Sequence, residues 1–149
     1  MIEHVWTVLC ARSIVDQSSN NISLLDVIEQ INVQAPPLQV GQEGLLPIHG
    51  ELVTLWTRSV DNQPCRADAR IRVISPSGTT AHEKDYSVDL MVSERVRTKI
   101  NIPVLSVREL GRHHFSVLLR NENDTEWHLV ATVPFVITLV SAERTAPLT

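Results

Sequence analysis

Alternating apolar and polar side chains run along most of the chain, a pattern typical of β-strands with one buried face. Residues 65–75 are a clear case, because four small or β-branched apolar residues alternate there with charged ones. The same period of two predicts further strands over residues 46–58, 84–92, 94–102, 111–120 and 125–133, and residues 135–140 are predicted as a final strand that is apolar on both faces. Residues 104–110 are short and mixed, and we expect one helical turn there.

The N-terminal stretch, residues 5–33, reads as one long hairpin with a polar tip at residues 16–21. Its first arm, residues 5–15, is apolar on both faces, which indicates a strand that is covered on both sides or meets a partner chain. The second arm, residues 22–33, is ambiguous. Leu24, Ile28 and Ile31 are spaced like one face of a helix, but the high content of Ile, Val and Leu favours a strand.

Turn residues divide the remaining segments. The proline-rich residues 34–44 predict an irregular crossover, and Pro76-Ser77-Gly78 predicts a tight turn. A three-residue loop, Asn121-Glu122-Asn123, is expected to join the strands on either side, with Pro134 interrupting the pairing of the second. The predicted inward residues of this pair are His113, Phe115, Val117 and Leu119, and opposite them Thr125, Trp127, Leu129, Ala131 and Val133.

These segments make seven to nine strands, with turns about every ten residues and no convincing long helix. Such spacing predicts an all-β fold, namely a two-sheet antiparallel β-sandwich of the immunoglobulin-like or C2-like kind. We expect residues 1–141 to form a single domain and residues 142–149 to be a frayed tail.

The charge and the cysteine content limit the expected partners and the expected cellular compartment. The chain has 149 residues, 13 Lys or Arg, 17 Asp or Glu and a formal net charge of −4, and no basic tail indicates specific binding to nucleic acid. Its two cysteines form no C-x-x-C pair, which favours a reduced, intracellular setting. Since we find neither a signal peptide nor an apolar run long enough to cross a bilayer, we expect a cytoplasmic protein without a transmembrane segment.

The apolar segment VLCARSIVD, the polar tip SSNN and the following ISLLDVIEQI, together with the late glycine-led strand Gly111-Arg112-His113-His114-Phe115-Ser116-Val117, resemble a family of uncharacterised bacterial proteins. That family is a domain of unknown function, thought to be an immunoglobulin-like or C2-like sandwich. The resemblance implies the same fold and supplies no catalytic residues.

Six histidines raise the question of a metal. His114 and His128 both face outward on the predicted hairpin, where the three-residue loop places His128 opposite Ser116, one pair along from His114. A shared metal is therefore the alternative hypothesis, although the chain has no H-E-x-x-H motif or Cys/His cluster. His113, by contrast, faces inward after a glycine, and we expect it to be buried, neutral and bonded to backbone.

No nucleophile motif, phosphate-binding loop or carboxylate cluster for calcium is present, so we predict no cofactor and no metal as the main interpretation. The sequence thus predicts a non-enzymatic binding or assembly module, with a small metal-dependent enzyme as the alternative. A homodimer is predicted through residues 5–11 or 135–140, which are apolar on both faces. An anionic partner is predicted for a basic outer face, which forms if two strands share one sheet, from Arg70, Arg72, Arg95, Arg97 and Lys99.

Overall fold

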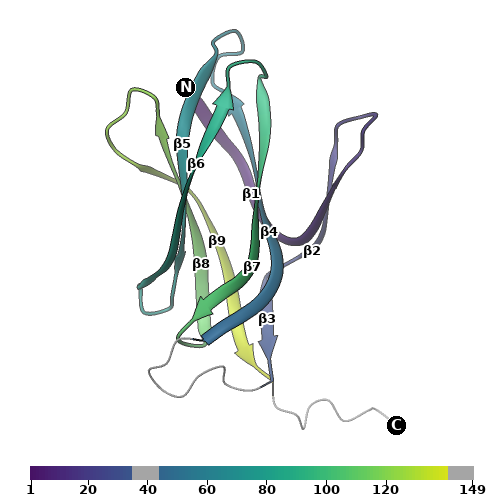
Figure 1. The fold of residues 1–149 in the computed structure, drawn as a ribbon, viewed down its shortest axis with the longest axis vertical. Helices are drawn as coiled ribbons and strands as arrows, with labels where there is room; N and C mark the ends of the chain where they lie inside the picture. The colour runs from purple at the N-terminus through teal and green to yellow at the C-terminus, as the bar shows by residue number, and fades with distance from the viewer. Residues whose placement is uncertain (35–43, 141–149) are drawn as a thin grey trace.

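The computed structural model describes residues 1–34 and 44–140, which form nine strands and no helix (Figure 1). The predicted crossover was residues 34–44, of which residues 35–43 lie outside the described residues, as does the predicted tail at residues 142–149. The strands are β1 (Ile2–Val15), β2 (Ile22–Val27), β3 (Gln30–Val33), β4 (Gly44–Arg58), β5 (Cys65–Ile74), β6 (Thr80–Leu90), β7 (Arg95–Val107), β8 (Gly111–Asn121) and β9 (His128–Leu139).

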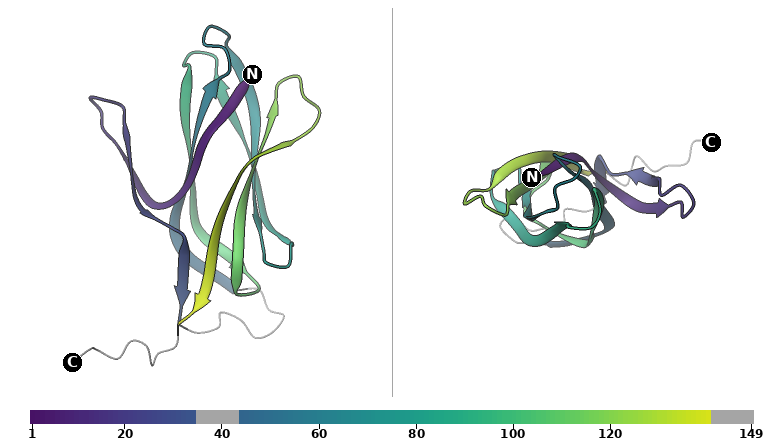
Figure 2. Two further views of the ribbon diagram at one scale, coloured as in Figure 1. Left: turned by 180° about the vertical axis from the view of Figure 1, so that it is seen from behind. Right: turned by 90° about the horizontal axis from the view of Figure 1, so that it is seen from above.

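The strands form two sheets that pack face to face (Figure 2). One sheet has the order β2-β1-β4-β7 and the other β3-β9-β8-β5-β6. This is the predicted all-β sandwich. One detail of the prediction is wrong, because β3 runs parallel to β9 while every other pair is antiparallel.

The alternation of apolar and polar side chains along the strands determines which residues form the core. Ala69, Ile71 and Val73 of β5 are at most 3% exposed, and they pair with buried residues of β8 such as Val117. Trp56, Phe115 and Phe135 are the largest fully buried side chains of the described residues. Each such side chain stabilises the fold by about 1.5–3 kcal/mol through removal of apolar surface from water.

The predicted N-terminal hairpin is confirmed in its first half only. β1 and β2 pair from Cys10↔Val27 to Val15↔Ile22, so the second arm begins as a strand and not as a helix. The chain then leaves this sheet, and β3 joins the other one beside β9. The change of direction follows Asp26, whose φ of 51° is a conformation that Asp tolerates better than most residues.

The hairpin also bends away from its own sheet. β1 pairs with β4 only as far as Cys10↔Glu51, and the rest of β1 pairs with β2 alone. β1 curves at this point, and the hairpin stands beside the sandwich, outside the ring that the two sheets form in the view from above (Figure 2). The outer face of the four-stranded sheet is therefore partly covered by the chain's own N-terminal hairpin.

Two local predictions are wrong, and the pairing between neighbouring strands explains both. Residues 104–110 contain no helical turn, because β7 continues to Val107 as the partner of β4. Pro134 does not interrupt β9 and lies opposite His114. The proline is tolerated because β3 pairs with β9 only from Val136 onward, so its missing N–H costs no hydrogen bond to β3.

The β8–β9 connection is longer than three residues, running from the end of β8 at Asn121 to His128. The register then shifts between Val117 and Leu118, where β9 contains one extra residue. The bulge reverses the faces beyond it, so Leu129, predicted to face inward, is 62% exposed.

Candidate functional site

The predicted basic residues fall into two groups on different sheets. Arg70 and Arg72 lie on β5 of the five-stranded sheet, whereas Arg95, Arg97 and Lys99 lie on β7 of the four-stranded sheet. Because the two groups lie on different sheets, they do not form the single basic face that was predicted for strands sharing one sheet.

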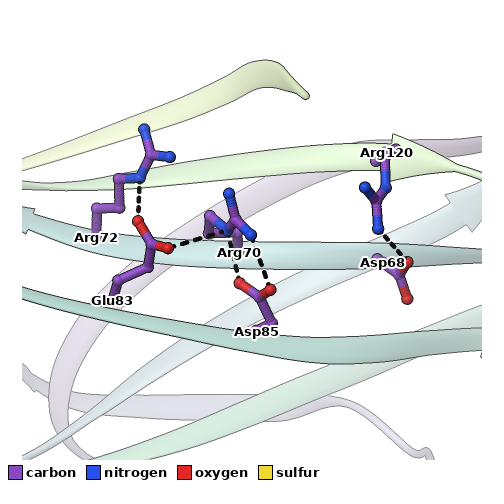
Figure 3. Close-up of polar contacts among 6 residues, drawn as sticks. All are labelled: Asp68, Arg70, Arg72, Glu83, Asp85 and Arg120. Atoms are coloured by element: carbon purple, nitrogen blue, oxygen red, sulfur yellow. Dashed lines mark hydrogen bonds and ion pairs between the residues drawn. The ribbon is translucent and has the colours of Figure 1, made fainter. Parts of the chain in front are cut away.

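Arg70 and Arg72 are neutralised by carboxylates on the neighbouring strand β6 (Figure 3). Arg70 donates from Nε to Asp85 Oδ1 at 2.6 Å and from Nη2 to Asp85 Oδ2 at 2.9 Å. Arg72 donates from Nε to Glu83 Oε2 at 2.6 Å. The hydrogen bond from Arg70 holds the pKa of Asp85 below its ordinary value.

The same face continues as a ladder of paired charges. Arg120 lies 3.0 Å from Asp68 (Figure 3) and Arg66 lies 3.4 Å from Asp89. The guanidinium groups of Arg70 and Arg120 also stack over the ring of Trp127, 4.2 and 4.6 Å from its centroid. Because each of these arginines has a carboxylate partner, this face is not a free cationic surface.

The basic residues of β7 contact the hairpin and its bend instead. Arg97 Nη2 donates to the backbone oxygen of Asn20 at 2.8 Å and to its side-chain Oδ1 at 3.0 Å. Lys99 Nζ lies 3.7 Å from Glu51 Oε1, and the other oxygen of Glu51 accepts a 2.7 Å hydrogen bond from Ser13 of β1. Two of the three residues therefore help to hold the hairpin against the sheet.

A cleft lies between the hairpin tip and the outer face of this sheet, with a volume of about 560 Å³. Trp6 and Leu55 are its apolar lining residues on β1 and β4, and Arg95 and Arg97 are its basic ones. Arg95 is exposed and forms no ion pair with any residue of 1–34 or 44–140. The complete lining is Trp6, Ser19, Asn20, Asn21, Ile22, Leu55, Arg95, Val96 and Arg97, a set without a carboxylate.

The histidines do not form the alternative metal site. His114 lies opposite Pro134, and His128 lies opposite Leu119, which is five residues along β8 from His114. Five residues of strand correspond to roughly 17 Å, too far for one ion. The prediction for this pair is wrong, because the bulge and the longer loop change the register. In the part of the chain that the structure describes, no group of three or more His, Cys, Asp or Glu could hold a metal.

His113 is 1% exposed, and its Nδ1 lies 3.0 Å from the carbonyl oxygen of Gly111. Its ring stacks on Phe135 with centroids 5.4 Å apart. The predicted burial and backbone contact are both confirmed.

Arg58 is a second buried basic residue, and it was not among the predicted site residues. It is 8% exposed and donates from Nε and Nη2 to the carbonyl of Leu90, at 2.9 and 2.7 Å, and from Nη1 to that of Asp61 at 2.7 Å. Because β4 and β6 belong to different sheets, Arg58 bonds across the sandwich. Its inward orientation could have been predicted from the sequence, because Arg58 lies two residues after the inward Trp56 and therefore on the same face of the strand.

No family model matches the chain, and no curated protein is significantly similar to it, so the resemblance to the uncharacterised bacterial family stays a hypothesis. One solved structure with a similar backbone is a glycosyl hydrolase family 2 member from Bacteroides cellulosilyticus, at 10% identity and a TM-score of 0.45. The alignment spans 69% of this chain and only 14% of that one, and it carries no argument about activity. The described residues contain no helix that is long and apolar enough to cross a membrane.

Proposed function

We propose that the protein is a non-enzymatic binding module that takes an acidic segment of a protein partner in the hairpin cleft. The observation that carries the proposal is the lining of that cleft, where two arginines lie beside Trp6 and no carboxylate balances them. On a chain with a formal net charge of −4, this is a local cationic site. A guanidinium binds carboxylates bidentately, and the indole supplies apolar contact beside it.

The two arginines have different roles in this proposal. Arg97 is partly used, since its Nη2 already holds Asn20 at the hairpin tip. Arg95 is exposed and has no ion pair within the described residues, so of the two arginines it is the one whose charge is available to a ligand. A single ion pair at such an exposed position contributes only about 0–1 kcal/mol, and salt screens it further. We therefore expect binding to fall steeply as the salt concentration rises.

The test compares Arg95→Gln with Arg72→Gln, each of which removes one positive charge from a strand. Retention on heparin at low salt, and anisotropy of a labelled Glu/Asp-rich peptide, are measured for both. We expect Arg95→Gln to weaken both interactions and Arg72→Gln to leave them nearly unchanged, because Arg72 is already paired with Glu83. Failure of the unaltered protein to bind the acidic peptide at low salt, or equal losses in both variants, would overturn the proposal.

A further inference from the structure

A second cavity of about 340 Å³ lies between the two sheets, where the edge strands β6 and β7 contact each other. Ile71 and Val73 of β5 and Ile100 and Ile102 of β7 belong to its apolar lining, and His82 and Lys84 of β6 are its titratable groups. The volume is near the lower end of the range of small-molecule pockets, roughly 300–1,000 Å³, and the mainly apolar lining is typical of them.

The notable residue is Lys84, because it lies on the core-facing side of its strand. In an antiparallel pair, residues directly opposite each other share a face. Lys84 lies opposite Ile71, which is 3% exposed, and Tyr86 lies opposite the fully buried Ala69. The register thus places Lys84 on the side of β6 that faces the other sheet, and it lines the cavity while its side chain stays exposed to solvent.

The surroundings of Lys84 leave its charge available. No carboxylate within residues 1–34 or 44–140 forms an ion pair with it, in contrast to Lys99, which lies near Glu51. His82, the next inward position of β6, lies opposite the buried Val73 and adds a second group that can bind an anion when protonated. The cavity therefore combines an apolar interior with a cationic group and lacks any acidic lining residue.

We propose that this cavity binds a small amphipathic monoanion, an aliphatic carboxylate whose chain enters the space between the sheets and whose carboxylate meets Lys84. Charge complementarity argues for the carboxylate, and the apolar lining argues for the chain. This site is separate from the hairpin cleft, because the two share no lining residue. Its test is therefore independent of the proposed function.

An inward-pointing charge on an edge strand has another known use, which is to prevent edge-to-edge pairing with a second molecule. β6 and β7 are both edge strands, so this use must be distinguished from ligand binding. Edge protection and ligand binding predict different results. If Lys84 only protects the edge, the protein needs no affinity for a carboxylate, and Lys84 variants should aggregate.

The experiment is calorimetry of the full chain with hexanoate, octanoate, decanoate and dodecanoate, and with decanol as the uncharged match for decanoate. We expect affinity to rise roughly fourfold per methylene until the cavity is filled, and then to level off. Decanoate should bind about tenfold more tightly than decanol. Lys84→Gln should remove this preference and leave decanol binding unchanged, while the charge-matched variant Arg112→Gln, at an exposed position of β8, should keep it.

Ala81→Leu, at a partly buried lining residue, should reduce the affinity for both ligands by filling the cavity. If that variant does not fold, the Lys84→Gln comparison still decides. No binding of decanoate at millimolar concentration, or an unchanged carboxylate preference in Lys84→Gln, would overturn the proposal and leave edge protection as the role of this lysine.

Discussion

Arg97 Nη2 lies 2.8 Å from the backbone oxygen of Asn20, a hydrogen bond between β7 and the hairpin tip across 77 positions of the chain. Asn20 has a φ of 58°, a left-handed conformation that Asn adopts readily in turns. The turn thereby directs both oxygens of Asn20 toward the sheet. The N-terminal hairpin is thus an outer flap that is anchored at its tip by Arg97 and near its bend by the contact between Ser13 and Glu51.

The anchor at the tip can be tested through Cys10, which is fully buried close to the bend of β1. Burial raises the pKa of its thiol, and the negative charge of Glu51 adds to this effect, so labelling of the native protein should be slow. In a Cys65→Ser background, we expect Arg97→Gln to speed up labelling of Cys10 by about fivefold, the effect of losing roughly 1 kcal/mol of hydrogen bonding. Arg95→Gln is the control, and an equal rate in both variants would contradict the anchor.

Arg58 should contribute strongly to stability. Its guanidinium supplies three hydrogen bonds to the carbonyls of Leu90 and Asp61 at the end of the sandwich. Arg58→Met should lower the free energy of unfolding by about 2–4 kcal/mol, because buried acceptors then lose their donors. Urea unfolding measures this, with Arg72→Gln as the surface control at under about 1 kcal/mol. Equal losses in the two variants would show that the bonds across the sandwich are unimportant.

The charge ladder should make stability depend on pH. The hydrogen bond from Arg70 lowers the pKa of Asp85 in the folded state, so the folded carboxylate releases its proton more easily than the unfolded one. The resulting stabilisation is present above the unfolded pKa of Asp, about 3.9, and is lost as the pH falls through the lower folded pKa. Carboxyl NMR should show Asp85 titrating below the usual Asp range in the unaltered protein and returning to that range in Arg70→Gln. A normal titration in both proteins would contradict the pairing.

Self-association remains a prediction, now on a different surface. β9 lies between β3 and β8, and β1 pairs with β4 up to Cys10 and with β2 beyond it, so both strands of the predicted dimer contact have partners within the chain. The outward face of the hairpin instead exposes Ile14, Leu25 and Val27, at 48%, 37% and 53%. We expect light scattering at tens of micromolar to give a dimer mass and the double variant Ile14→Ser, Leu25→Ser to give a monomer mass. A monomer mass for the unaltered protein would remove the prediction.

The alternation of side chains was enough to predict which residues of β5 and β8 are buried. His113 could be placed in the core from the same pattern, since the period of a strand is a local property that needs no knowledge of its neighbours. The all-β class follows in the same way. Lys84 lies in the inward series of β6, so that signal was present in the sequence, but its meaning depends on the cavity around it.

Pairing between distant segments had to come from the tertiary structure. Whether Arg70 and Arg97 share a sheet depends on strand order, and whether His114 meets His128 depends on the length of the β8–β9 loop and on one extra residue in β9. A shift of one residue reverses every later side chain, and nothing local marks where it occurs. The sequence alone therefore determined the strands and most of their buried faces, whereas the packing of the sheets and the folded-back hairpin decided which charges are paired, which are free and where the two cavities lie.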